Sequence, residues 1–409
     1  MNEAKSTPPA IVLGVGITAL GVMRCLARSG VKTYCADEKI DFVRHSRYYA
    51  KPPGSELLGS TDQLSQFLRR LNLDQAVLMP AGDQWSRAIY GIEPDLKPRF
   101  FASAPSFDIW NTLTDKGLLA KFLTTHDIPH PRSLEIDSGA NLNNAQSLFP
   151  GKWFIKPRDS EQFFRKYWVK AFEVANLEEL KKRAEQLFGD GLGFILQEYI
   201  QGPPSNHIFV DGFIDRDGEV RGLLARQRLR MFPRLFGNSS YMVTIDKSQA
   251  SREIELILSA LRAASYRGIF SVEFKRDERD SIPRLLEINT RPWWYIWFAE
   301  RCGVSFAQMA YRDALERDVE TCDTYSVGTY MVYPLNDLYA CREAVRNGKL
   351  TYAGWLGEWF KAKQAVFWIG DPLPSLIWFI REIWRYCGRR LARRRGKSRA
   401  NRTKATTGA

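Results

Sequence analysis

The sequence predicts a chain of mixed architecture, α/β over residues 10–110 and α+β over residues 111–320. The α/β prediction comes from short apolar runs that alternate with amphipathic stretches, because parallel βαβ units have this order. The α+β prediction comes from two pairs of alternating runs joined by polar turns, at 207–230 and 268–292, because antiparallel hairpins have this pattern. The rest of the chain is rich in tryptophan and arginine and predicts a helical segment with a basic tail.

Composition limits the classes of protein to consider. The 409 residues carry a net charge of +13, but nine of the positive charges lie within 389–404, which leaves only +4 for the rest. Nucleic-acid binding by the body of the chain is therefore not favoured. The six cysteines are scattered, which favours reduced thiols in the cytosol over a zinc site or a disulfide framework. The N-terminus has no signal-peptide pattern, and no apolar run reaches the ~18–20 residues needed to span a bilayer.

The first strand, AIVLG, is followed by glycines where the first helix should begin. Gly14, Gly16 and Gly21, with Asp37 further on, partly match the dinucleotide-binding fingerprint, but the third glycine is displaced from its usual position. Residues 1–110 are therefore expected to form a Rossmann-like domain. Nicotinamide binding stays open as an alternative.

Asp83 follows the apolar strand 76–79 at the edge where open α/β sheets bind ligands. One interpretation is that its carboxylate contacts a substrate. The other is that it caps the helix that begins there.

The hairpin at 268–292 is expected to bring three oxygen-bearing side chains together. With its turn centred near Asp280, Glu273 lies opposite Glu287, and strand alternation puts Asn289 on the same face as Glu287. Two carboxylates and an amide oxygen suit Mg²⁺, which also bridges nucleotide phosphates. The alternative is a solvated sheet face whose acids are neutralised by neighbouring basic residues.

The pattern VEF…LLEINTR in this hairpin resembles the metal-binding end of the ATP-grasp superfamily, in its carboxylate–amine ligase type. In that superfamily two acids and an asparagine hold magnesium against the ATP phosphates, and the arginine that follows binds the carboxyl or acyl-phosphate group. The resemblance implies Mg²⁺ ligation by Glu273, Glu287 and Asn289, and a catalytic role for Arg291. It also implies that the N-terminal domain is a pre-ATP-grasp domain and that 111–320 forms a two-lobed ATP-grasp domain.

Two lysines match the phosphate contacts of the superfamily. Lys116 belongs to a D-K pair at the start of the ATP-binding half, and Lys156 ends the strand KWFIKP. A compact ammonium group suits a phosphate, although Lys156 also fits an ordinary surface lysine at a strand end. The superfamily covers the phosphates with a glycine-rich loop, but residues 158–168 contain no glycine. Closure over the phosphates would then depend on basic side chains, or the segment would be a recognition loop.

The stretch GFILQEYIQGPP resembles the hinge that holds adenine in this superfamily. The resemblance implies that Glu198 faces the exocyclic amine and that the backbone of Tyr199 and Ile200 reads the purine edge. His207 or Asn206 would reach the ribose or a phosphate. The alternative for His207 is a buried strand histidine with its hydrogen bonds satisfied.

The strand LLARQRLRMFP carries Arg226, Arg228 and Arg230 on one face. Beside a triphosphate, such a row neutralises the charge that develops in phosphoryl transfer, so Arg226 and Arg228 are predicted to be catalytic. The alternative is a row that faces solvent. The aromatic run PWWYIWF, after Arg291, is expected to form interface core, with a substrate-pocket lining as the alternative.

The C-terminal part is expected to comprise an extension, 321–374, and an amphipathic helix with a basic tail, 375–409. Tryptophans flanked by arginines are typical of a helix on an anionic membrane surface. The alternative is a helix that docks on the body and is followed by a disordered tail, and RNA contact is less favoured.

The resemblance implies an ATP- and Mg²⁺-dependent ligase that joins a carboxylate to an amine through an acyl phosphate and releases ADP and phosphate. The substrates would be small molecules or cell-envelope precursors. The location would be cytoplasmic, with peripheral contact at the inner face of the membrane. Two alternatives stay open: a non-catalytic binding or scaffold protein with the same fold at the membrane surface, and a nicotinamide-dependent reductase.

Overall fold

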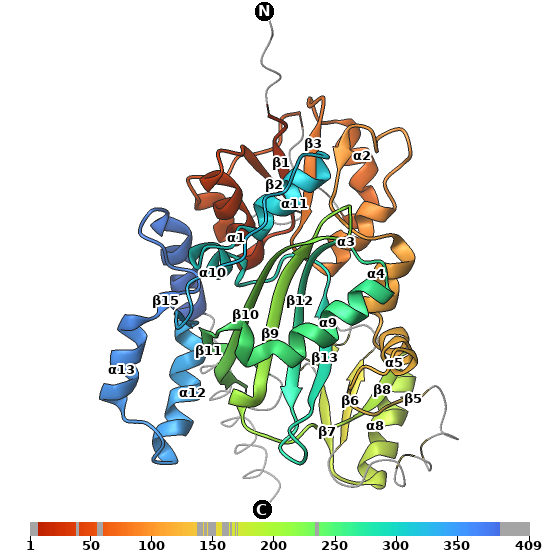
Figure 1. Cartoon of the computed structure of the whole chain (residues 1–409), viewed down its shortest axis with the longest axis vertical. Coiled ribbons are helices and arrows are strands. Elements are labelled where there is room, and N and C mark those ends of the chain that lie inside the picture. The colour runs from red at the N-terminus through yellow and green to blue at the C-terminus, as the bar shows by residue number, and fades with distance from the viewer. Residues whose placement is uncertain are drawn as a thin grey trace, which may run out of the picture.

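The computed structural model arranges the chain as three sheets with their helices (Figure 1). The residues that it describes are 7–37, 41–54, 60–136, 142, 145, 153–157, 163, 166–167, 169, 171–233 and 237–384. Most of the glycine-free segment 158–168 lies outside the described residues, as does the basic tail from 385 onward, so the predictions about phosphate closure and about the tail fall there.

The first sheet is parallel, in the order β2-β1-β3-β4, as the alternation of apolar runs predicts. Its strands are β1 (Ala10–Leu13), β2 (Thr33–Ala36), β3 (Ala76–Pro80) and β4 (Phe100–Phe101). The helices and 3₁₀ turns of this region are α1 (Gly16–Arg28), η1 (Phe42–His45), η2 (Thr61–Gln63), α2 (Leu64–Arg69) and α3 (Asp83–Tyr90). Every residue of β1 and β2 is buried, which fits the apolar composition of parallel strands.

The second sheet is antiparallel, in the order β5-β8-β6-β7. Its strands are β5 (Ser133–Ile136), β6 (Trp153–Pro157), β7 (Phe172–Val174) and β8 (Phe194–Glu198), and α8 (Leu177–Gly189) packs with it. Two helices lead into it, α4 (Phe107–Thr114) and α5 (Lys116–Thr125). Asp115 separates these helices because its carboxylate caps α5, accepting hydrogen bonds from the amides of Gly117 and Leu118.

The third sheet has seven strands, in the order β13-β12-β9-β10-β11-β14-β15. The strands are β9 (His207–Ile214), β10 (Val220–Phe232), β11 (Asn238–Thr244), β12 (Gly268–Arg276), β13 (Pro283–Asn289), β14 (Tyr330–Val332) and β15 (Lys363–Gln364). Its helices and turns are η4 (Pro204–Asn206), η5 (Lys247–Ala250), α9 (Ser251–Ala263), α10 (Ile296–Arg301) and α11 (Phe306–Ala314). Strand β9 pairs antiparallel with β10, and β12 with β13, so both predicted hairpins are confirmed.

The aromatic run after Arg291 forms core between the first and third sheets. Trp293 and Trp297 are each 2% exposed, and they share one hydrophobic cluster with Val12 of β1 and Leu224 of β10. In Figure 1, α1 and α10 lie between the parallel strands and the seven-stranded sheet. The prediction of interface core is confirmed, since these rings join two sheets in one hydrophobic cluster.

The C-terminal part completes the edge of the third sheet, where α12 (Pro334–Arg346) and α13 (Tyr352–Lys361) follow β14. A further helix spans 372–384. Asp371, directly before this helix, attaches it to α1 through a buried ion pair, in which Arg24 Nε donates to Asp371 Oδ2 at 3.0 Å. None of the described helices is long and apolar enough to cross a bilayer.

Candidate functional site

Glu273 and Glu287 are direct partners across β12 and β13, and Asn289 pairs with Ser271 two residues along the same strands. This is the predicted register. The register shifts immediately after Glu273, where Phe274 pairs with Leu285. The predicted symmetric register therefore holds at the end of the hairpin that carries the acids, but not nearer the turn. A bulge beside a pair of acidic residues is a common way to aim side chains at one point.

Glu273 is held from two sides. Its Oε1 accepts a hydrogen bond from His207 Nδ1 at 2.7 Å and lies 3.0 Å from Arg228 Nη1. Burial alone would raise the pKa of Glu273, but the charge of Arg228 and the hydrogen bond from His207 hold it well below its usual range. Burial and the charge of Arg228 lower the pKa of His207 to about 4. At pH 7 the pair is therefore an ionised carboxylate and a neutral imidazole that donates from Nδ1.

Lys116 begins α5 and Lys156 lies in β6, and both are near enough to Glu287 for their charges to interact. Lys116 Nζ donates to the carbonyl oxygen of Pro157 at 2.8 Å, which brings the first turn of α5 to the end of β6. Burial and the charge of Lys156 lower the pKa of Lys116 to about 8, and the charge of Glu287 opposes this shift. Burial also lowers the pKa of Lys156, against the charges of Glu287 and Glu273. The charges of the predicted phosphate lysines, from α5 and the second sheet, therefore act on those of two predicted metal ligands of the third sheet.

Asp83 brings the first sheet to the same place. Its carboxylate forms a two-point ion pair with Arg291, at 2.6 Å from Nε and 2.9 Å from Nη2. Gly82 is the N-cap of α3 and Asp83 makes no capping bond, so the helix-cap interpretation is wrong. The Asp83 side chain is 59% exposed, and Arg291, with a smaller contribution from Lys116, lowers the pKa of its carboxylate. An exposed carboxylate beside the site is compatible with the predicted substrate contact.

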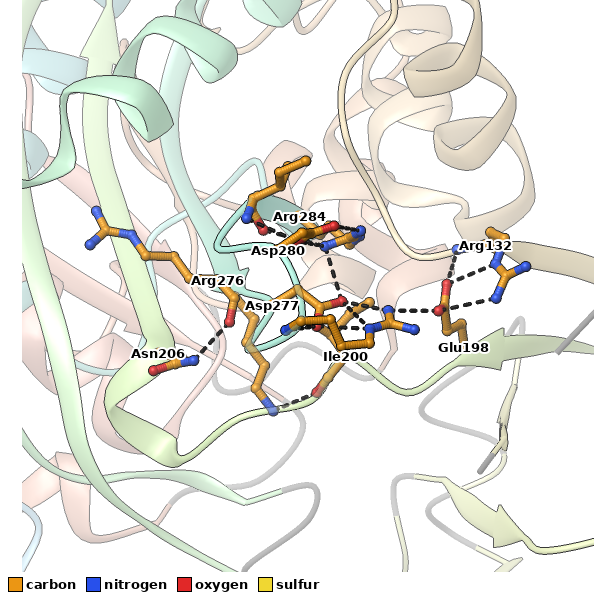
Figure 2. Close-up of polar contacts among 11 residues, drawn as sticks. Arg132, Glu198, Ile200, Asn206, Arg276, Asp277, Asp280 and Arg284 are labelled. Atoms are coloured by element: carbon orange, nitrogen blue, oxygen red, sulfur yellow. Dashed lines mark hydrogen bonds and ion pairs between the residues drawn. The ribbon is translucent and has the colours of Figure 1, made fainter. Parts of the chain in front are cut away.

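At the predicted adenine hinge, the Glu198 carboxylate lies within a row of alternating charges (Figure 2). It accepts hydrogen bonds from Arg132 Nε at 3.0 Å and from Arg279 Nη2 at 2.7 Å. The row consists of Arg132, Glu198, Arg279, Asp277, Arg284 and Asp280. Two guanidinium groups already engage this carboxylate, so recognition of a base at this hinge would fall to the backbone groups of 198–200.

Lys275 organises the backbone beside the hinge. Its Nζ donates to the carbonyl oxygen of Ile200 at 2.7 Å and lies 4.6 Å from the ring centroid of Tyr199. Figure 2 also shows Asn206, whose Nδ2 donates to the carbonyl oxygen of Arg276 at 2.9 Å. Burial, with the charge of Arg228, lowers the pKa of Lys275 to about 8. The hinge is thus tied to β12, the strand that carries Glu273.

The arginine row of β10 faces acids inside the protein, so the solvent-facing alternative is wrong. Arg226 is fully buried, donates from Nε to Asp211 at 3.0 Å, and lies 3.7 Å from the ring centroids of both Phe209 and Tyr295. Arg228 reaches Glu273, as described above. Arg230 forms ion pairs with Asp337 and Glu358 of the C-terminal part. The catalytic roles of Arg226 and Arg228 stay predictions.

Asp211 is a site residue that the sequence pattern did not select. It is an acid in the middle of the apolar strand HIFVDGFI, and it accepts from Ser271 Oγ at 2.7 Å as well as from Arg226. A buried acid requires a partner, so an acid in a fully buried strand is a usable signal for an ion pair with a basic residue on the neighbouring strand.

At the N-terminal glycines, the structure disfavours a bound dinucleotide. The amide of Gly16, at the start of α1, donates to Asp41 Oδ2 at 3.1 Å. A side chain at Gly14 would meet the indole of Trp85 at 3.0 Å. A carboxylate and an indole therefore occupy the place where the fingerprint receives a pyrophosphate.

The arrangement of the three sheets is similar to that of ATP-grasp proteins. No family model matches the chain. The solved structures it resembles include carboxyaminoimidazole ribonucleotide synthase from Aspergillus clavatus with ATP (TM-score 0.60, 14% identity, 83% of this chain and 87% of that one). They also include the biotin carboxylase domain of Hydrogenobacter thermophilus 2-oxoglutarate carboxylase with MgADP (TM-score 0.59, 15% identity, 78% and 73%).

The same comparison finds the L-amino acid ligase from Bacillus licheniformis (TM-score 0.53, 13% identity, 76% of this chain and 74% of that one). In sequence, the chain is 23% identical to the D-aspartate ligase of Enterococcus faecium over 245 residues, 58% of each chain. It therefore matches under two thirds of the length of that curated relative. These similarities confirm the ATP-grasp resemblance at the level of the fold.

Proposed function

We propose that the protein is an ATP-dependent ligase that joins a carboxylate to an amine through an acyl phosphate. The observation that carries this proposal is the Glu273–Glu287 pair, whose charges interact with Lys156 of β6 and, in the case of Glu287, with Lys116 of α5. Opposed acids and ammonium groups of this kind suit a metal-bound polyphosphate, whose charge phosphoryl transfer must neutralise. Relatives that are named as ligases, acting on D-aspartate and on L-amino acids, support it.

Glu273, Glu287 and Asn289 would hold Mg²⁺ in this proposal. Within the described part of the chain, no group of three His, Cys, Asp or Glu side chains could hold a metal ion. A magnesium ion would then take two carboxylates and the Asn289 amide oxygen, with the remaining positions for phosphate and water, as Mg²⁺ usually does. The ionised state of Glu273 fits this chemistry. When bound, the metal neutralises charge on the β- and γ-phosphates.

The chain's own residues would position the reactants. Lys116 and Lys156 would hold the phosphates, and His207 and Arg228 would keep Glu273 in place. The backbone of Tyr199 and Ile200 would hold the adenine, with Lys275 fixing the Ile200 carbonyl. These roles rest on the positions described above and on the resemblance of the fold.

Arg291 would bind the substrate carboxylate while one oxygen of that carboxylate attacks the γ-phosphorus of ATP. The bond from that phosphorus to the bridging oxygen breaks, and ADP leaves. The amine nitrogen then attacks the acyl carbon, the carbon–oxygen bond to phosphate breaks, and the nitrogen loses a proton to give the amide. Arg226 and Arg228 would contribute positive charge behind Glu273 during the first transfer.

The substrates we propose are a small-molecule or envelope-precursor carboxylate and an amine, in the cytoplasm. The five cysteines that the structure describes are all free, which supports a reducing compartment. A screen of acid and amine pairs for phosphate release in the presence of Mg-ATP tests the activity. Release that requires both partners supports the ligase, and release that needs no amine contradicts it.

A scaffold protein with the same fold is the second candidate, favoured by the lack of glycine in 158–168. A thermal-shift assay with Mg-ATP separates the two, since absence of stabilisation favours the scaffold. The nicotinamide reductase is not favoured, because Asp41 and Trp85 occupy the glycine turn.

A further inference from the structure

The helix at 372–384 exposes an apolar face and buries the opposite one. Trp378 and Ser375 are buried, and Ser375 Oγ donates to the carbonyl oxygen of Val366 at 2.8 Å, so one side of the helix is attached to the body. Large apolar side chains on the other side are between 42% and 74% exposed. They are Leu373, Leu376, Phe379, Ile380, Ile383 and Trp384. At 100° per residue these positions share an arc of roughly 140°. An ordinary surface helix buries such an apolar face, whereas this helix exposes it.

The apolar arc, as we name these six side chains, continues onto the segment before the helix. Ile369 is 84% exposed and lines a hollow together with Leu373, His45 and Arg47. The hollow is formed by two distant parts of the chain, since His45 and Arg47 belong to the η1 region. The backbone there is fixed, because Asp371 accepts from Arg47 N at 3.0 Å and from Ser46 Oγ at 2.7 Å. The surface is therefore part of the fold.

Basic side chains border this surface. Arg44, Arg47 and Arg381 are exposed, and Arg47 Nη1 is 3.4 Å from the carbonyl oxygen of Gly370. His45 lies near two of these charges, since partial burial together with Arg44 and Arg381 lowers its pKa. We name these three arginines the basic rim. Beyond the helix, the sequence adds nine basic residues and no acid within 389–404.

We propose that the apolar arc and the basic rim form one docking surface for an anionic lipid bilayer. Apolar side chains that enter the acyl boundary, with arginines at headgroup level, are the composition of an interfacial helix. A two-fold dimer through the same face is the competing occupant. It would place two basic rims against each other, and like charges at short range oppose such an interface. The surface acts independently of the ligase proposed above.

Cosedimentation of the full chain with phosphatidylcholine vesicles, with and without phosphatidylglycerol, tests this surface. Binding is expected only with the anionic lipid. The double variant Leu376→Glu/Ile380→Glu should bind at least about tenfold more weakly, because it puts two charges into the acyl boundary. Arg44→Gln/Arg47→Gln/Arg381→Gln should weaken binding and its salt dependence. The matched control is Val327→Glu, an apolar residue of similar exposure in the loop between α11 and β14, and this variant should bind as wild type does.

Thermal unfolding of each variant shows whether it is folded, and Trp384→Ser provides a milder second test of the apolar arc. Wild-type vesicle binding by both arc variants would overturn the proposal. Sedimentation equilibrium tests the competing occupant. If the wild-type protein is a dimer that does not bind vesicles, and Leu376→Glu/Ile380→Glu dissociates it, this face is an interface between copies and the lipid proposal is wrong. ATP turnover is measured separately, so failure of the ligase proposal leaves these readouts intact.

Discussion

Asp83 and Arg291 form a two-point ion pair that joins the first turn of α3 to the end of β13, across 208 positions of sequence. Arg291 lies two residues after the end of the strand that carries Glu287 and Asn289. The pair therefore fixes the carboxyl edge of the parallel sheet beside the proposed metal and phosphate site. If a substrate carboxylate binds Arg291, as proposed, Asp83 of α3 would lie beside it.

We expect Arg291→Lys to reduce ligase turnover at least about tenfold while Mg-ATP still stabilises the protein. Lysine keeps the charge but not the planar two-point geometry that binds a carboxylate. Turnover and Mg-ATP thermal shift, measured on the same preparation, check this. Asp83→Asn is the companion variant, and it should change the free energy of unfolding by less than about 1 kcal/mol, because the Asp83 side of the ion pair is 59% exposed. Wild-type turnover in Arg291→Lys would contradict the assignment.

Glu287→Gln should abolish ATP turnover and leave the fold intact. The substitution keeps the size of an exposed side chain but removes one of the two charges that face Lys116 and Lys156. Steady-state ADP release and circular dichroism are the measurements. Glu278→Gln, an exposed acid in the turn of the same hairpin, is the matched control and should behave as wild type does. Normal ADP release by Glu287→Gln would end the metal assignment.

Affinity for ADP should fall as the pH rises from 7 to 9. The pKa of Lys116 is about 8 in the free protein, against an ordinary value of 10.5. At pH 9 roughly one tenth of the side chain is charged, so its attraction for phosphate weakens by up to about tenfold. Between about pH 8 and pH 10.5, the pKa values of Lys116 in the folded and unfolded chain, the unfolded chain binds the proton more tightly. The free energy of unfolding without nucleotide therefore rises with pH in that window.

Calorimetric titration with Mg-ADP at both pH values measures this effect. Lys116→Arg is the control, since an arginine stays charged throughout and should flatten the part of the pH dependence that Lys116 causes. An equally steep decline in Lys116→Arg would assign the titration to another group.

The sequence predicted those parts of the site that depend on short-range periodicity. Glu273 lies opposite Glu287 because strand alternation and a short turn determine the register locally. The bulge after Glu273 was not predictable, because it depends on packing against other strands. Contacts between distant segments were missed for the same reason. Arg132 and Arg279 reach Glu198 across 66 and 81 positions, and no periodic pattern relates such residues.

How the first sheet and its helices contribute to the candidate site also depends on tertiary structure. Sequence pattern placed Asp83 at a strand end but left substrate contact and helix capping equally open. The structure shows that Asp83 does not cap α3, because Gly82 is the N-cap and the Asp83 carboxylate pairs with Arg291 instead. The apolar helix at 372–384 shows a similar limit, since its composition indicated an interfacial helix, whereas the exposed face and the role of η1 emerge only from the packing.

Arg226→Met should lower the free energy of unfolding by about 3–5 kcal/mol, because it leaves the fully buried Asp211 carboxylate without its guanidinium partner. Burial raises the pKa of Asp211 and lowers that of Arg226 to about 10, so each charge depends on the other. Urea unfolding gives the measurement. The double variant Asp211→Leu/Arg226→Met removes both charges and should recover much of the loss. If the double variant is as unstable as Arg226→Met, the cost lies in the packing of the guanidinium between Phe209 and Tyr295.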